Sequence, residues 1–198
     1  MNGSPAIVEW FRRDTPPAFL PESAVIVGGT SLLAHALASA AGIGTDGEIA
    51  VAAPWVSEGV MDQMPGWREL NHSGIDLLVV TRSKAEARRA LAELGRFPWK
   101  SMKIQVKRRL HAKLYAFLNK TGGGVCLFGS HNLTAAGNTT NDEAGVLFVG
   151  TQNAPVGAVI RACRDHIFEL AGKGELFHDT MRWPVGETIN EKEVMIHD

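Results

Sequence analysis

Two short apolar runs rich in β-branched residues, at 48–53 and 75–81, most constrain the fold of this chain. Both are bounded by Gly, Pro and Ser, and neither shows the regular apolar–polar alternation of a strand with one wet face. They therefore predict strands buried on both faces. After the second run, Ser83 predicts the N-cap of a helix and Gly95 its end. Strand and helix thus alternate, as in an α/β layered domain.

Beyond Trp99 the pattern becomes richer in strands. Four are predicted, at 103–106, 110–118, 125–129 and 143–149, and a glycine-rich turn at 119–124 joins the middle two. A last helix is predicted from Asn153, with Pro155 in its first turn. Helical turns at 57–64 and a short helix at 31–41 complete the pattern. We expect an α/β fold with a mixed β-sheet flanked by helices.

The length of 198 residues fits one domain with short tails. Four prolines in residues 1–22 predict an N-terminal arm, because proline sustains neither a helix interior nor an inner strand. We expect the folded domain at 23–173 and a C-terminal tail at 174–198.

The net charge of −1 excludes a uniformly basic nucleic-acid binder, so any basic footprint must be local. One candidate is a run between residues 100 and 113, whose members are Lys100, Lys103, Lys107, Arg108, Arg109 and Lys113. Two interpretations stay open: a surface that binds phosphates, or a solvated edge strand protected by positive charge. The first makes Lys107, Arg108 and Arg109 candidate substrate-binding residues.

The compartment is predicted from cysteines and apolar segments. Cys126 and Cys163 lie in apolar stretches, where a thiol behaves as a small hydrophobe, so we expect no disulfide scaffold. No basic leader precedes an apolar run, and no segment approaches the length of a membrane span. We expect a cytoplasmic protein with no membrane partner.

Polar residues at strand ends supply the candidate chemistry. In a strand at 110–118, the two-residue period places His111 and Lys113 on one face. The same period places Ser130 and Asn132 together as short hydrogen-bond donors to a phosphate oxygen. Glu143 is predicted at a strand start, where it could hold an imidazole through one nitrogen. Each residue alone is weak evidence, and the combination is specific.

Together these residues resemble the signature of the phospholipase D superfamily. The matching positions are His111-x-Lys113, Gly129-Ser130-x-Asn132 and Glu143. The fuller family motif has an Asp where this chain has Leu118, which we expect in the core. The resemblance is therefore closer to family branches without that Asp, which include metal-independent restriction endonucleases.

The resemblance implies a phospholipase D-like homodimer, because the family's chemistry uses two His-x-Lys motifs and this chain has one. His111 of one protomer would attack phosphorus, and His111 of the other would protonate the leaving oxygen. Lys113 and Asn132 would hold the non-bridging oxygens with help from Ser130, and Glu143 would orient the imidazole. No metal or cofactor is expected, since the other histidines lack ligand spacing.

Three functions remain open at this point. The first is a nuclease, with DNA favoured over RNA, because the basic run leads directly into His111. The second is a lipid or small-molecule phosphodiesterase, which the same groups could serve. The third is a catalytically inactive, nucleic-acid-binding dimer, which Leu118 favours.

Overall fold

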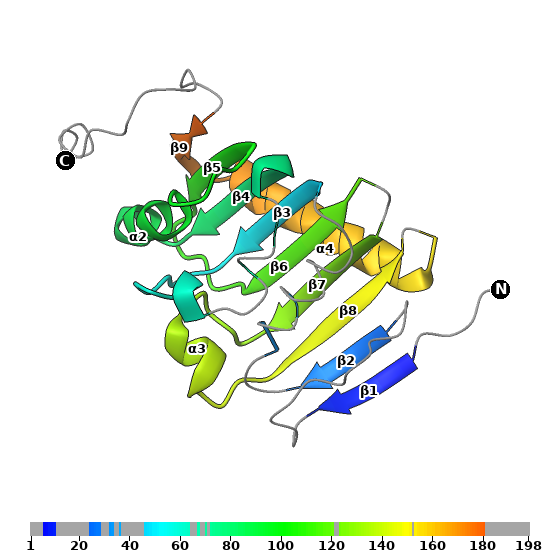
Figure 1. Cartoon of the computed structure of the whole chain (residues 1–198). Helices are drawn as coiled ribbons and strands as arrows, with labels where there is room; N and C mark the ends of the chain where they lie inside the picture. Colours follow the sequence, from blue (N-terminus) through cyan, green and yellow to red (C-terminus); the bar gives the residue numbers. More distant parts are fainter. Residues whose placement is uncertain are drawn as a thin grey trace.

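The computed structural model describes residues 6–10, 24–28, 32–33, 36, 46–63, 67, 70, 72–120, 123–151 and 153–180. Its centre is one mixed sheet with the strand order β1-β2-β8-β7-β6-β3-β4-β5-β9 (Figure 1). The strands are β1 (Ala6–Trp10), β2 (Ala24–Gly28), β3 (Gly47–Ala52), β4 (Ile75–Thr81), β5 (Ser101–Val106), β6 (Leu114–Asn119), β7 (Gly123–Gly129), β8 (Gly145–Thr151) and β9 (Glu175–Asp179). The predicted mixed sheet is confirmed.

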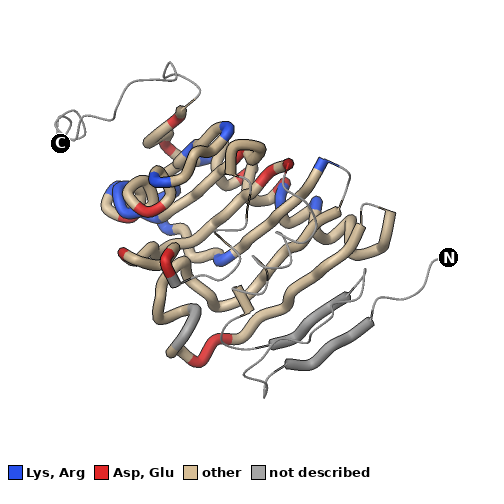
Figure 2. Tube along the Cα trace, viewed as in Figure 1, with Lys and Arg blue, Asp and Glu red and all other residues tan. Residues whose placement is uncertain are grey.

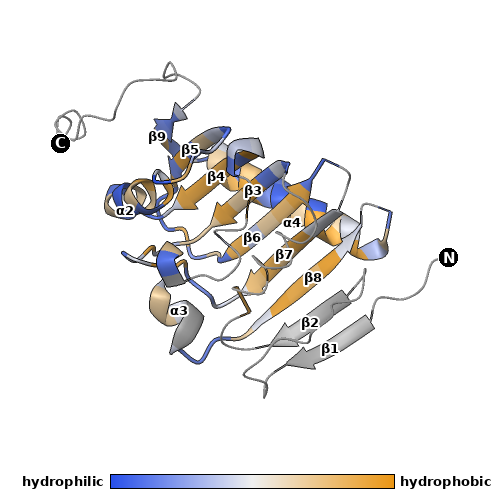
Figure 3. Cartoon of the chain, viewed as in Figure 1, coloured by the Kyte–Doolittle hydropathy of each residue, from blue (hydrophilic) through white to orange (hydrophobic). Residues whose placement is uncertain are grey.

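Two helices, α2 (Lys84–Leu94) and α4 (Pro155–Gly172), cover opposite faces of this sheet (Figure 1). In β3 the two-residue period divides the core, since Ile49 and Val51 belong to the cluster under α2. Ala50 and Ala52 belong to the cluster under α4. Residues of the central strands are mostly apolar (Figure 3), and β3 packs into a hydrophobic cluster on each face, as the sequence predicts for buried strands. The short helix α3 (Ala135–Thr139) lies between β7 and β8 in the chain.

The boundaries of α2 follow the predicted caps. The side chain of Ser83 accepts a hydrogen bond from the backbone N–H of Glu86, 3.3 Å away, and satisfies one unpaired donor of the first turn. Gly95 donates its N–H to the carbonyl of Leu91 at 2.8 Å. The helix therefore begins and ends where the sequence predicts.

Close packing fixes α4 against the sheet. A Cβ added to Gly150 of β8 would lie 2.1 Å from Cγ2 of Val156, so glycine is needed for the helix to approach. Cys126 of β7 and Cys163 of α4 are both buried, and both are free thiols. The interaction with Cys163 and burial together raise the pKa of the Cys126 thiol, so it stays protonated.

The sheet extends beyond the predicted domain limits on both sides. β1, within the predicted arm, pairs in parallel with β2, and β9, within the predicted tail, pairs antiparallel with β5. The predicted tail boundary at 174 therefore cuts off an edge strand of the sheet. The rest of the arm and tail, and most of the predicted helix at 31–41, lie outside the described residues. The division into arm, domain and tail stays a prediction.

One further property concerns membranes. Within the described ranges, no helix combines the length and the apolar character needed to cross a bilayer.

An aromatic cluster at the amino-terminal end of β4 contains a buried histidine. His72 is 7% exposed and stacks on Phe97 with 4.5 Å between ring centroids. Trp99 meets the same imidazole edge-on at 4.7 Å. Burial lowers the pKa of His72 below its ordinary value, because the charged form would lose its hydration.

We expect this histidine to make the protein less stable in mild acid. The unfolded chain carries an ordinary histidine, so it binds the proton first as pH falls below about 6.5. The free energy of unfolding should therefore decrease between pH 7.5 and pH 5. In urea titrations, His72→Phe should flatten this slope without abolishing it, because burial also lowers the pKa of His178. An unchanged slope would show that His72 does not cause the loss.

Candidate active site

One edge of the sheet collects loops from six strands. β3, β4 and β5 are parallel, so their carboxyl ends meet there. β6 runs the other way and begins at this edge, with Leu114 opposite Ala52. β7 ends and β8 begins at the same edge, where Gly129 pairs with Gly145. We call six residues in these loops the strand-end site: Trp55, Arg82, His111, Lys113, Ser130 and Glu143.

His111 and Lys113 lie together, although not for the predicted reason. β6 begins at Leu114, so both residues belong to the preceding loop and not to a strand from 110. Lys113 Nζ lies 3.4 Å from His111 Nδ1 and donates to the His111 carbonyl at 3.0 Å. His111 is exposed and Lys113 half-buried. Burial lowers the pKa of Lys113, and the negative charge of Glu143 acts against this shift.

Ser130 and Glu143 form a second pair across the loop ends of β7 and β8. Ser130 Oγ donates to Glu143 Oε2. Asn141 Nδ2 donates to the other carboxylate oxygen at 3.2 Å. The strand predicted at 143–149 begins at Gly145, so Glu143 precedes it. In the single chain Glu143 therefore holds Ser130 and Asn141, its charge reaches Lys113, and no hydrogen bond joins it to His111.

The loop after β7 carries the remaining predicted groups. A Cβ on Gly129 would lie 2.6 Å from the carbonyl oxygen of Ala144, so glycine lets the two backbones approach closely here. β7 ends at Gly129, so the predicted strand alternation of Ser130 and Asn132 does not apply. Asn132 is half-buried, and its Oδ1 is buried without a hydrogen-bond partner. Such a group is costly unless something pairs with it.

Two residues of the strand-end site are not found by the sequence analysis. Trp55 follows β3 and meets the His111 ring edge-on, with 6.1 Å between ring centroids. Arg82 follows β4 and places its Cζ 4.7 Å from the centre of the Trp55 ring. Both stand just beyond the carboxyl end of a predicted parallel strand, which is where open α/β sheets bind ligands. That rule is the signal that could have found them.

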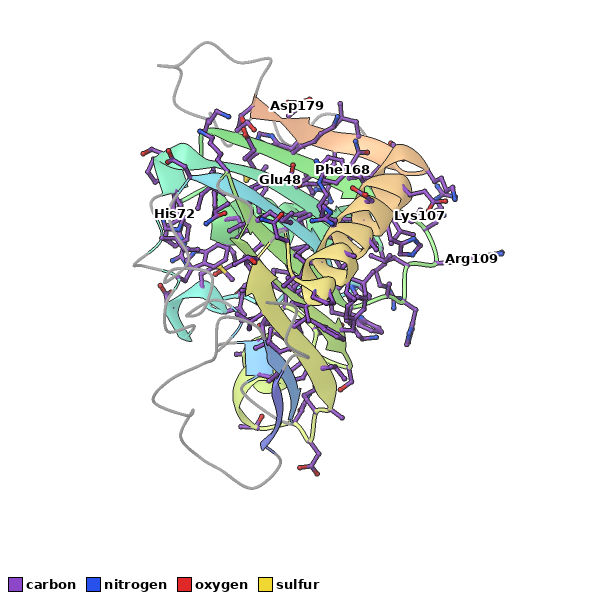
Figure 4. All side chains as sticks on the ribbon, turned by 90° about the vertical axis from the view of Figure 1, so that its right-hand side faces the viewer. Glu48, His72, Lys107, Arg109, Phe168 and Asp179 are labelled. Atoms are coloured by element: carbon purple, nitrogen blue, oxygen red, sulfur yellow. The ribbon has the colours of Figure 1, made fainter. Side chains whose placement is uncertain are left out.

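The basic run divides between the two ends of β5. Lys100 precedes the strand and pairs with Asp76 at 2.5 Å. Lys107 and Arg109 follow the strand and lie at the opposite edge from His72 (Figure 4), with Arg108 between them in the chain. Figure 2 shows lysine and arginine on α2 and at both ends of the strands of the sheet. Only the second half of the run therefore flanks the strand-end site.

Leu118 lies far from this site. It stands five residues after Lys113, which is about 16 Å along a strand, and pairs with Glu48 at the other end of β6. The side chain is half-buried and packs against the cluster under α4, as expected for a core residue. Position 118 therefore lies outside the strand-end site of this chain.

Among the described residues of the strand-end site, Lys113 and Arg82 carry the positive charge. Lys113 lies beside the imidazole of His111, and Arg82 lies over the indole ring of Trp55. Where the structure describes the chain, no three His, Cys, Asp or Glu side chains come together as ligands for a metal ion. The site can bind an anionic group and offers one exposed imidazole for nucleophilic or proton-transfer chemistry.

The fold is that of the phospholipase D family. The structure is similar to Nuc from Salmonella typhimurium, a phospholipase D family member, with a TM-score of 0.53 and 17% identity over 79% of this chain and 99% of Nuc. It is also similar to NucT from Helicobacter pylori, with a TM-score of 0.51 and 11% identity over 77% of this chain and 99% of NucT. No protein-family model and no curated protein matches the sequence. The family resemblance predicted from the motifs is confirmed at the level of the fold.

Proposed function

We propose that this chain is a metal-independent phosphodiesterase, and specifically a nuclease that cleaves DNA or RNA through a phosphohistidine intermediate. One observation carries the proposal. Within a phospholipase D fold, His111 and Lys113 lie 3.4 Å apart at the sheet edge that also holds Ser130 and Glu143. The basic loop 107–109 beside this edge favours a polyanionic substrate.

The proposed reaction has two displacements. A His111 nitrogen attacks phosphorus and forms a P–N bond while the P–O bond to the leaving group breaks. A second imidazole gives its proton to the leaving oxygen, then removes a proton from the water that breaks the P–N bond. Lys113 and Asn132 hold the non-bridging oxygens as negative charge develops, and Ser130 assists them.

The contact between Lys113 and His111 indicates which imidazole nitrogen carries the proton in the single chain. It therefore bears on the roles of nucleophile and general acid. An ammonium that donates to Nδ1 leaves the proton of a neutral imidazole on Nε2. The general acid must instead be the imidazolium, which carries a proton on both nitrogens. The nucleophile needs the opposite tautomer, with an acceptor for the Nδ1 proton. We assign the role of acceptor to Glu143, whose negative charge already acts on Lys113 in the single chain. The required hydrogen bond would form in the assembled site.

A homodimer follows from the chemistry. Attack and protonation occur on opposite sides of phosphorus, so one imidazole cannot perform both in the same step. His131, the other histidine in these loops, is fully buried and is not accessible to substrate. We therefore infer that two chains each contribute one His111, paired about a twofold axis.

The proposal predicts cleavage in the presence of excess chelator. Plasmid DNA and a structured RNA should be cut at the same rate with and without EDTA, because a histidine nucleophile and lysine side chains supply what a metal would otherwise provide. The measurement is initial rates from gel assays on protein dialysed against chelator. Complete loss of cleavage in EDTA, restored by magnesium, would contradict the mechanism. Cleavage of a lipid phosphodiester but of neither nucleic acid would favour the second function.

The basic loop should control salt dependence. Neutralising residues 107–109 removes three charges from the edge that flanks His111, so nucleic-acid binding should weaken and its slope against log salt should become shallower by up to about 3. Arg109 has a φ of +63°, so it should become Asn, which tolerates this conformation, while Lys107 and Arg108 become Gln. Lys100→Gln, at the far end of β5, is the matched control. An unaltered slope in the triple variant would place these charges outside the binding surface.

A further inference from the structure

The half-buried indole of Trp55 connects two cations. The Arg82 guanidinium carbon lies 4.7 Å from the ring centre, and Lys113 Nζ lies 5.3 Å from it. Both distances are within the range of cation–π attraction. The two positive groups are therefore no more than about 10 Å apart. Each cation thus makes an attractive contact with the ring, although the other cation lies nearby with the same charge.

Backbone hydrogen bonds on both sides hold Trp55 in place. Ala53 donates its N–H to the carbonyl of Val80 at 3.0 Å. Val56 donates its N–H to Glu86 Oε2 at 2.8 Å, and Arg89 binds the other oxygen of this buried carboxylate at 2.6 Å. Such an anchored segment preorganises the ring at the site, in the way that supporting contacts orient functional groups.

Arg82 differs from three other arginines of the described chain, whose guanidinium groups are paired. Arg89, Arg96 and Arg164 each pair with a carboxylate. Arg82 is exposed, and in the described part of the chain its interaction is with the Trp55 ring and not with an acidic side chain. A guanidinium so placed retains its paired N–H groups for an incoming anion, and phosphate matches their geometry.

We propose that Arg82, held by Trp55, forms a subsite for the phosphate that neighbours the one undergoing cleavage. A nucleic-acid strand carries one charge per about 3.4 Å of helix axis, so a second phosphate one to three nucleotides away falls within reach of Arg82. A substrate with a single phosphodiester has nothing to place there. This inference rests on the proposed function and narrows the substrate to chains of successive phosphodiesters.

Binding to short oligonucleotides tests the subsite separately from catalysis. The protein carries His111→Ala to prevent turnover, and thymidine oligonucleotides with one, two, three and four phosphodiesters compete against a fluorescent strand at fixed salt. Affinity should rise about tenfold when the ligand becomes long enough to reach the second cation, which is the scale of a hydrogen bond to a charged group. Arg82→Ala should remove that step and leave the affinity for the single phosphodiester within about twofold.

Matched variants separate the subsite from general charge loss. Arg88→Ala removes an exposed arginine from α2 and should retain the step. Trp55→Leu should lose it as Arg82→Ala does, whereas Trp55→Phe should keep most of it. Equal losses for short and long ligands in Arg82→Ala, the same loss in Arg88→Ala, or no binding of any oligonucleotide would each overturn the subsite.

Cleavage by the protein with intact His111 distinguishes the two proposals. A rise in affinity with oligonucleotide length that depends on Arg82, without any cleavage of nucleic acid, would support the subsite and refute the nuclease. Cleavage of both bis(4-nitrophenyl) phosphate and DNA, with Arg82→Ala slowing the two equally, would sustain the nuclease and refute the subsite. We expect Arg82→Ala to slow cleavage of DNA alone.

Discussion

Replacing His111 with alanine should lower phosphodiester cleavage by about 10⁴-fold or more, because removing the nucleophile from a concerted catalytic set removes most of its rate advantage. The fold should be unaffected. His111 is exposed, precedes β6 and contributes an edge contact to Trp55, so little packing depends on it. Initial rates on plasmid DNA and urea unfolding midpoints of the same preparations measure both expectations.

The control for this variant is another exposed histidine. His166 lies on α4 and contacts Glu169, with Nδ1 and Oε2 3.3 Å apart. His166→Ala should retain the wild-type rate within about twofold, as surface substitutions away from a site usually do. Near-normal cleavage by His111→Ala would show that another residue is the nucleophile. A large loss in both variants would show that the assay reports stability.

The local parts of the fold could be predicted from the sequence. The helix between Ser83 and Gly95 is specified by caps that act within a few residues, and the structure places it there. The buried strands β3 and β4 were predicted for a similar reason, since their apolar runs do not depend on the order of the sheet. Pairing at the edges was harder to predict. β9 pairs with β5 across about seventy residues of chain, and no local signal in 175–179 indicates that partner.

Residues of the site, too, could be predicted from the sequence only where they belong to a local motif. Motif spacing identified His111 and Lys113, and the structure brings them to within 3.4 Å. The strand period used to pair them was wrong, because the strand begins only at Leu114. Whether these residues catalyse a reaction stays a prediction. Trp55 and Arg82 were missed because they lie 56 and 29 residues before His111, in the loops that follow β3 and β4.

Because the chain has a single His-x-Lys motif, an experiment can determine whether one site uses one chain or two. If each reaction uses two imidazoles, a dimer has one composite site, and both chains must carry His111. Independent sites would add their rates. The two arrangements give different results when one chain of the dimer is altered and the other is not.

Mixed dimers of wild-type and His111→Ala chains should therefore be nearly inactive in turnover, since every composite site lacks one imidazole. The two chains carry different affinity tags, are refolded together and are purified through both tags in succession, and their rate is compared with that of doubly tagged wild-type dimers. Arg88→Ala chains, treated identically, should give mixed dimers at the full wild-type rate, which controls for the refolding. About half the normal rate in the His111→Ala mixture, or sedimentation of the active wild-type protein as a monomer, would rule out a site that uses two histidines from two chains.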